Sequence, residues 1–419
     1  LFPYTTLFRS HDNKSLDVGG GLSLFRTGGT VAGNTIAENE AVAGGGLYLE
    51  ESAPTISGND ILSNTAGAGG GGGLYLVDSG ATVISNTVRA NIADDGANGS
   101  GGGIKVEGSD SDGATIGHNE VAENQSHWVG AGVFVNDSAA TVTDNWIHHN
   151  AGNEGSGVTV EYGQPLIAGN TLEYNWAGWR GGAMLYQKDA GGQLAANVIR
   201  DNDAKWDAGA ILIRQSTPTL VNNVILNNDL TSGGTGGVVV ISSTLQAEHN
   251  TIVGNDGGDG CGVFVQSGGS AITLTNTIVA SQTTGISVED GSVLQVDGVL
   301  WYANDANVAG DGTIAVTQAL TGTPAFAADG VHILTTSAAI DAGVAVSLTC
   351  DIDGDVRPVN YGYDLGADEV TVDLAKPTLD VHSPTMAAGD VPITAAIVMT
   401  FSEAIDTGTL AVTVTPDPG

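Results

Sequence analysis

A short apolar–polar–apolar triplet recurs along the chain between Gly19 and Asn304. Leu47, Tyr48 and Leu49 form a typical triplet, which a polar turn and two smaller apolar stretches follow. Alternation with a period of two indicates strands, and it predicts that the outer residues of each triplet face inward and the middle residue outward. The pattern therefore predicts three short strands per repeat and no helix.

An asparagine motif, N-x-φ-x-x-N with φ apolar, punctuates each repeat about every 27 residues. A repeat of this length without a helix cannot bury an apolar face alone, so successive repeats must stack as parallel coils about 4.8 Å apart. The first asparagines would then stack along one bend as a ladder of side-chain amides. Five positions later an asparagine follows in every repeat except the last, which has Ser281. The predicted ladder contains Asn34, Asn59, Asn86, Asn119, Asn145, Asn170, Asn197, Asn223, Asn250 and Asn276.

This repeat resembles the right-handed parallel β-helix family, whose best known members are pectate lyase-like proteins. The resemblance covers residues 15 to 310, and it implies an all-β solenoid of about 11 coils over residues 11–311. Such a repeat is specific for the fold and says almost nothing about chemistry.

Three flanking segments differ from the repeat. Residues 312–375 contain the phrases SAAIDAG, DIDGDVRP and YDLGADE, which resemble the closing segment of bacterial surface β-helix proteins, so we expect this segment to cap the last coil. Residues 376–419 resemble the start of a bacterial Ig-like module, which implies a partial β-sandwich. Residues 1–10, LFPYTTLFRS, resemble a translated sequencing adapter, and we interpret them as a non-native tail on a fragment of a longer protein.

Composition narrows the partners. The chain has 12 Lys and Arg against 47 Asp and Glu, a formal net charge of −35, which disfavours nucleic acid and anionic membranes. No apolar run is long enough to span a bilayer. Cys261 and Cys350 form neither a disulfide framework nor a metal-site spacing. We expect a monomer, located outside the cell or on its surface as the resemblance implies.

Reactive residue types concentrate between residues 89 and 214, which hold five of the six tryptophans. When the coils are aligned on the first inward residue of each triplet, the position five residues earlier is Trp128, Asn153, Trp179 and Trp206. Three of four successive coils would then present an indole at the same height, which suits stacking on a flat sugar ring. The alternative is that these tryptophans cover an apolar loop edge.

The position four residues before each triplet is Val129, Glu154, Arg180 and Asp207. Glu154 and Asp207, two coils apart, would lie about 9 to 10 Å from each other, close to the carboxylate separation of inverting glycosidases. Arg180 between them could bind a uronate carboxylate in a bidentate fork. The alternative is a surface ion ladder that contributes little stability.

Further candidates lie near this row of residues. Lys205 and His127 could serve as base or acid or be solvated, and Glu161 and Arg214 occupy outward positions where they could contact a substrate. The sequence offers candidate oxygen ligands for a calcium ion at Glu107, Glu161, Asp110 and Asp112. The D-x-D-G-D run from Asp351 to Asp355 departs from the EF-hand pattern and favours a turn.

Two other patterns leave alternatives or are set aside. The aromatic middle positions Tyr48, Tyr75, Phe134 and Phe264 predict either an exposed stripe or packing under a loop. His148 and His149 are rejected as a metal pair, since neighbours on a regular strand point to opposite faces.

Two functions fit these observations. The first is a secreted or cell-surface rod that binds a polysaccharide, a glycan or a surface protein and so acts in adhesion, and we favour it because no catalytic motif matches. The second is a polysaccharide lyase or glycoside hydrolase with its cleft along coils 4 to 8, on the face of the long strands, where the resemblance to pectate lyase-like proteins implies a cleft. A lyase acting on polyuronate would need cations to neutralise its substrate, so neutral glycan fits this acidic chain better than pectate.

Overall fold

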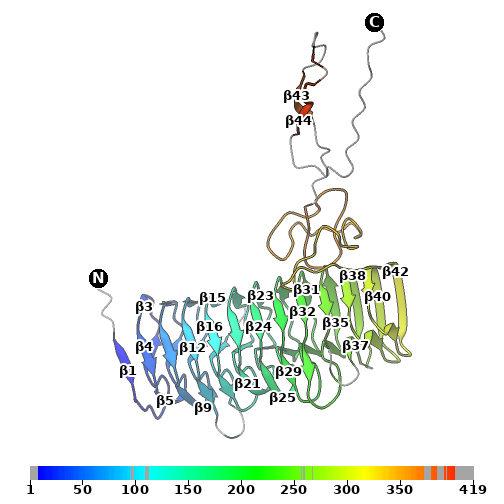
Figure 1. Cartoon of the computed structure of the whole chain (residues 1–419). Helices are drawn as coiled ribbons and strands as arrows, with labels where there is room; N and C mark the ends of the chain where they lie inside the picture. Colours follow the sequence, from blue (N-terminus) through cyan, green and yellow to red (C-terminus); the bar gives the residue numbers. More distant parts are fainter. Residues whose placement is uncertain are drawn as a thin grey trace. The chain divides into compact units, whose positions relative to one another are not determined.

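The computed structural model describes residues 8–94, 96, 99–108, 113–255, 257, 260–266, 268–371, 379–384, 391–392 and 394–401. Residues 1–370 form one compact unit and residues 371–419 another. The first unit is a right-handed parallel β-solenoid of about eleven coils, and no helix occurs among the described residues (Figure 1). The predicted fold class is confirmed.

Each regular coil contributes one strand to a twelve-stranded sheet, two to a 22-stranded sheet and one to an eight-stranded sheet. Neighbouring coils pair in parallel, and the chain passes through the three sheets in that order (Figure 1).

The twelve-stranded sheet contains the apolar triplets: β2 (Leu22–Phe25), β6 (Leu47–Glu50), β10 (Leu74–Val77), β14 (Ile104–Glu107), β18 (Val133–Asn136), β22 (Val158–Glu161), β26 (Met184–Gln187), β30 (Ile211–Arg214), β34 (Val238–Ile241), β37 (Cys261–Val265), β39 (Thr284–Val288) and β41 (Ala306–Ala309). The eight-stranded sheet consists of β5 (Glu40–Ala43), β9 (Thr65–Gly70), β13 (Ile92–Ala93), β17 (Gln125–Ser126), β21 (Ala151–Glu154), β25 (Trp176–Arg180), β29 (Asp203–Ala204) and β33 (Asp229–Leu230).

The 22-stranded sheet carries the asparagine motif: β1 (Arg9–His11), β3 (Thr30–Ala32), β4 (Thr35–Ala37), β7 (Thr55–Ser57), β8 (Asp60–Leu62), β11 (Thr82–Ile84), β12 (Thr87–Arg89), β15 (Thr115–Gly117), β16 (Glu120–Ala122), β19 (Thr141–Thr143), β20 (Trp146–His148), β23 (Leu166–Ala168), β24 (Thr171–Glu173), β27 (Gln193–Ala195), β28 (Val198–Arg200), β31 (Thr219–Val221), β32 (Val224–Leu226), β35 (Thr244–Glu248), β36 (Thr251–Val253), β38 (Ala271–Ala280), β40 (Val293–Tyr302) and β42 (Thr313–Thr321). Arg9 and Ser10, from the stretch interpreted as a non-native tail, lie in β1, which pairs with β4.

Two ladders of buried asparagines hold the bends of the 22-stranded sheet. In the first ladder, each side-chain Nδ2 donates to the Oδ1 of the next asparagine over 2.9–3.0 Å, from Asn34 through Asn250. A second ladder runs from Asn39 to Asn255 with distances of 2.8–3.0 Å. Because these amides also bond backbone groups, the polar atoms at the bends are satisfied although they are buried.

The prediction for the last rung was wrong. The register pairs Thr251 with Ile278, so Asn250 lies opposite Thr277, and Asn276 lies opposite His249. Asn276 instead bonds Val344 through both its amide nitrogen and its oxygen. In the second ladder Gln282, and not Ser281, follows Asn255.

The outer residues of each triplet fill the core, as Leu47 and Leu49 show with no exposed surface. The middle residues form a second apolar layer, in which Phe134, Leu185 and Leu212 pack with Val129 from a loop. Tyr48 and Phe134 are 8% and 5% exposed, so the packed alternative is correct for these two rings and the exposed stripe is not.

Residues 322–370 pack along one side of the last coils. Every residue of this segment is described, and it contains isolated bridges but no strand or helix. Leu365 and Ile333 join an apolar cluster with Val253 and Leu300 of the 22-stranded sheet, and Figure 1 shows the segment beside β31 to β38. The expected cap over the last coil is therefore wrong, and the 22-stranded sheet continues through β42, beyond the expected boundary at residue 311.

A buried polar network fixes this segment. Arg357 donates to Glu369 over 3.1 Å and contacts His249 Nδ1 at 2.8 Å, and the side chains of Arg357 and Glu369 have no exposed surface. Burial and the neighbouring Arg357 charge lower the pKa of His249 to about 3. Asp351 accepts hydrogen bonds from the backbone of Asp353 and Asp355, which makes the D-x-D-G-D run a turn, as expected.

In the second unit, β43 (Leu379–Ser383) pairs antiparallel with β44 (Val398–Phe401). Most of the predicted Ig-like module lies outside the described residues, so that assignment stays a prediction.

Candidate functional site

The parallel pairing aligns the predicted row of charged residues. Val129 pairs with Glu154, Glu154 with Arg180, and Arg180 with Asp207, so the four residues occupy four successive coils in register. This alignment is the one expected from the sequence, because each coil enters the twelve-stranded sheet through the same short turn.

Three tryptophans line a groove beside this row. The side chains of Trp128, Trp179 and Trp206 are 39%, 47% and 49% exposed, and the rings of Trp128 and Trp179 meet edge to face with centroids 6.0 Å apart. They share a pocket of about 550 Å³ with Glu154, Arg180 and Arg214. We call this pocket the tryptophan groove. The expected shared, solvent-accessible face is present.

Opposite charges meet in and beside the groove, and Asp207 does not line the groove itself but a neighbouring pocket. Arg180 Nε lies 3.0 Å from Asp207 Oδ2, and Arg214 Nη2 lies 3.6 Å from Glu154 Oε2. Glu154 is only 4% exposed, so its buried carboxylate has a cation within reach, as a buried charge requires. The groove thus offers apolar ring faces between charges that compensate each other.

A hydrogen-bonded chain extends from the groove over the twelve-stranded sheet. Arg214 donates to Gln187, and Gln187 Nε2 donates to Glu161 over 2.5 Å. Lys188 Nζ lies 2.7 Å from the other oxygen of Glu161. Glu161 is 5% exposed and does not line the groove, and it is linked to Arg214 through Gln187.

Lys205 and His127 do not line the tryptophan groove. Lys205 Nζ sits 5.4 Å from the centroid of the Trp206 ring, a cation–π contact. His127 lines a different pocket and faces Asp94, with Nδ1 3.5 Å from the carboxylate. His127 and Trp128 are adjacent in the sequence but line different pockets.

The residues considered for calcium are held in other ways or lie outside the described part of the chain. Glu107 pairs with Lys105 at 2.8 Å and accepts a hydrogen bond from Tyr75, while Asp110 and Asp112 are outside the described residues. Within the described residues, two other groups bring His and carboxylate ligand atoms within 4.8 Å of one another: His11 with Asp12 and Glu38, and His332 with Asp353 and Asp368. Neither group is predicted from the sequence, because each one joins residues from separate turns.

His148 and His149 lie closer together than expected. Their Nδ1 atoms are 2.8 Å apart, because His149 follows the end of β20 with a left-handed φ of 54° and the alternation of a regular strand stops there. Trp146 stacks on His148 with ring centroids 3.8 Å apart. Burial lowers the pKa of His148, and the neighbouring charge of His149 lowers it further. The geometric reason for rejecting this pair was wrong.

A family model described as a right handed beta helix region matches residues 9–127 and 102–277. The chain belongs to this family. The matched residues of this β-helix protein include the tryptophan groove and all the asparagines of both ladders. A search among curated proteins finds no matching relative.

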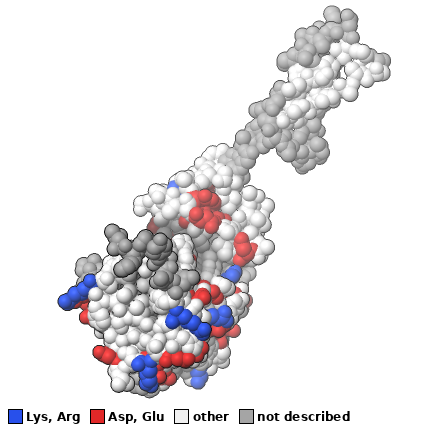
Figure 2. All heavy atoms as spheres, turned by 90° about the vertical axis from the view of Figure 1, so that its left-hand side faces the viewer, with Lys and Arg blue, Asp and Glu red and all other residues white. Residues whose placement is uncertain are grey.

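The described residues of the β-helix protein include no candidate membrane-spanning helix. Its basic residues are mostly engaged in ion pairs, including Lys14 with Glu40 and Arg26 with Glu51. Figure 2 shows basic side chains (blue) next to acidic ones (red), and uncharged surface lies between these mixed groups.

Proposed function

We propose that this β-helix protein binds carbohydrate in the tryptophan groove and works as a secreted or cell-surface recognition protein. The observation that carries the proposal is the shared pocket of three half-exposed indoles with polar groups between them. An indole left open to solvent is an apolar surface whose burial under a sugar ring is favourable, while the nearby guanidinium groups can donate hydrogen bonds to hydroxyl oxygens.

A neutral glycan fits the electrostatics best. The groove residues Arg180 and Arg214 already face Asp207, which lies beside the groove, and Glu154, so binding an anionic sugar would require these pairs to open. The chain as a whole carries a formal charge of −35, which repels polyanions at long range. The proposed ligand is therefore an uncharged polysaccharide segment, bound by a monomer.

Glycoside hydrolysis is the second candidate. One observation favours it: Glu154 and Asp207 lie two coils apart in register, with Arg180 between them. At the usual strand spacing this puts the two strands about 9 to 10 Å apart, near the range of inverting enzymes. Such an enzyme would use one carboxyl group as acid and the other as base toward a water molecule.

The test is a panel of neutral and anionic glycans incubated with the full chain, with and without calcium. Both bound glycan and newly released reducing or unsaturated ends are measured. We expect binding that Trp179→Ala weakens and no product. Product that disappears in Glu154→Gln and Asp207→Asn would instead establish the enzyme.

Trp146→Ala provides the matched control, since Trp146 is 46% exposed and lies on β20 outside the groove. Its binding should equal that of the unchanged chain. Absence of both binding and product across the whole panel would refute both candidate functions.

A further inference from the structure

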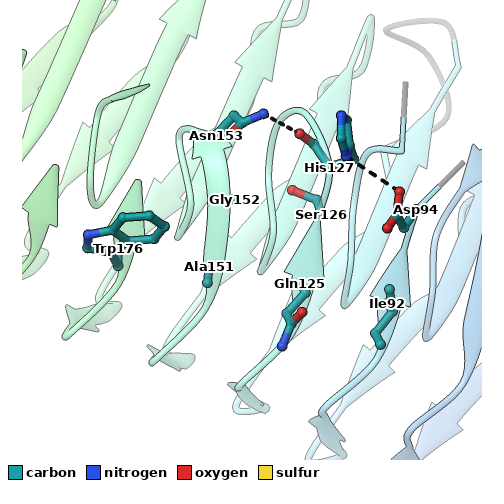
Figure 3. A pocket seen from close by; sticks show the side chains of 9 residues that line it. All are labelled: Ile92, Asp94, Gln125, Ser126, His127, Ala151, Gly152, Asn153 and Trp176. Atoms are coloured by element: carbon teal, nitrogen blue, oxygen red, sulfur yellow. Dashed lines mark hydrogen bonds and ion pairs between the residues drawn. The ribbon is translucent and has the colours of Figure 1, made fainter. Parts of the chain in front are cut away.

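A second trough lies on the eight-stranded sheet, next to the tryptophan groove. It has a volume of about 270 Å³, and its lining includes Asp94, Gln125, His127, Asn153 and Trp176 (Figure 3). We call it the His127 trough. None of its lining residues lines the tryptophan groove.

The coil register builds one wall of this trough. Gln125 pairs with Ala151, and Ala151 pairs with Trp176, so the three residues form one row across three coils. Gln125 is exposed and the Trp176 side chain is 46% exposed. The row therefore presents an amide and an open indole with a small residue between them, which leaves room above Ala151.

The opposite wall is polar. His127 Nδ1 lies 3.5 Å from Asp94, and Asn153 Nδ2 donates to the carbonyl oxygen of His127 over 2.6 Å, as Figure 3 shows. These contacts hold an imidazole, a carboxylate and an amide around one hollow. Groups that both donate and accept hydrogen bonds suit the hydroxyls of a sugar, as a ring face suits the indole.

A β-bulge in β25 lies between the residue that lines the trough, Trp176, and the residue that lines the groove, Trp179. Gly152 pairs with Ala177, but Glu154 pairs with Arg180, so β25 contains one residue more than β21 over this stretch. A bulge re-aims side chains that strict alternation would turn to opposite faces. Trp176 and Trp179 are consequently both exposed on the same strand, at 46% and 47%.

The two pockets flank a single ridge of backbone. His127 lines the trough and Trp128 the groove, and in the next coil Asn153 lines the trough and Glu154 the groove. Along β25, Trp176 and Trp179 are three residues apart, which corresponds to about 10 Å of strand. That span exceeds one pyranose ring.

We propose that the His127 trough is a second sugar subsite, occupied by another unit of the same neutral glycan that binds the tryptophan groove. This inference rests on the proposed carbohydrate binding and specifies its ligand: an oligosaccharide that crosses the ridge at residues 127–128 and 153–154, with one sugar on Trp176 and others on the tryptophans of the groove. A monosaccharide fills only one of the two sites.

The experiment measures affinity against glycan length. Full chain is titrated with neutral β-linked gluco-, xylo- and manno-oligosaccharides from the monosaccharide to the hexasaccharide. In the series that binds, Trp176→Ala should weaken binding of the longest members about tenfold and leave the shortest binders unchanged. Trp179→Ala should weaken binding at every length.

Gln125→Ala gives a second test of the subsite if Trp176→Ala misfolds, because Gln125 is exposed and lies in the same row of the trough. Its loss of affinity should be smaller and again confined to long ligands. Trp146→Ala serves as the control for removing an exposed indole elsewhere.

The outcomes separate the two ideas. Unchanged affinity of Trp176→Ala and Gln125→Ala at every length, with loss in Trp179→Ala, would overturn the second subsite and leave the groove standing. Equal losses for short and long ligands in Trp176→Ala would also contradict a shared oligosaccharide. Failure of all three series to bind would overturn this inference, while the proposed carbohydrate binding would fall only if the whole glycan panel failed as well.

Discussion

The asparagine bends and the tryptophan groove are built by the same coils, but they use repetition in opposite ways. At the first ladder every coil from Asn34 to Asn250 supplies the same side chain with the same hydrogen bonds. In the row beside the groove, four coils in equivalent register supply Val129, Glu154, Arg180 and Asp207. A position that repeats maintains the stack, whereas a position that changes from coil to coil is free to carry chemistry.

The comparison is tested most severely by Asn150→Leu in the middle of the second ladder. Asn150 accepts from Asn124 and donates to Asn175 and to the Val121 carbonyl oxygen, so its loss leaves several buried polar groups without partners. We expect the free energy of unfolding to fall by about 3 kcal/mol or more. Urea unfolding measures the change.

The exposed Gln193→Ala variant is the control for Asn150→Leu and should stay within about 0.5 kcal/mol of the unchanged chain. A loss equally small in Asn150→Leu would show that apolar packing alone holds the bends.

Asn276→Ala asks whether the same residue type has a different role outside the ladder. Its amide bonds both the carbonyl oxygen and the N–H of Val344, and so ties residues 322–370 to the solenoid. We expect a loss of about 1 to 3 kcal/mol, confined to that segment. Hydrogen exchange should show faster exchange around Val344 and unchanged protection in β16 and β20; deprotection of those strands would contradict a local role.

Trp179→Ala should affect binding and spare the fold. Trp179 is 47% exposed, and a glycan stacked on it would lose about tenfold in affinity, or about 1.4 kcal/mol, when the ring is removed. Calorimetric titration measures the affinity, and unfolding of the same sample should change by less than about 0.5 kcal/mol. A large drop in stability with normal affinity would show that Trp179 maintains the fold and does not bind the glycan.

The smallest expected effect depends on pH. The hydrogen bond to Asp329, together with Asp353, raises the pKa of His332 to about 9. Because this exceeds the unfolded value of about 6.5, protonated His332 contributes its full stability below pH of about 6.5 and loses it as the pH rises through about 9. His332 is partly exposed, so the contribution should stay below about 1 kcal/mol.

His332→Gln should therefore be less stable than the unchanged chain near pH 6 and equally stable above the folded pKa. Amides do not titrate, so the loss in Asn150→Leu should be the same at both pH values. A His332→Gln deficit that persists at high pH would show that shape, and not charge, accounts for it.

Much of the groove was predictable because its geometry follows from the number of residues between fixed points of each coil. The distance from each inward residue back to the preceding turn is constant in this part of the chain, so Trp128, Trp179 and Trp206 could be aligned without coordinates. The same counting failed at Asn276, where the stack follows Thr277 instead, and motif matching could not detect a shift of one residue. It also overlooked Trp176, since the bulge that exposes it beside Trp179 leaves no mark in the repeat.

By itself, the sequence determined the coils, the strands and the bends, because period-two alternation and a regularly spaced buried asparagine are local requirements that each repeat satisfies in the same way. Tertiary structure alone decided which outward residues are covered, as with Phe134 under Val129, and where residues 322–370 pack. It also decided that His127 and Trp128 lie in separate pockets. These features depend on contacts between residues far apart in the chain, whose energies arise only after the coils have stacked.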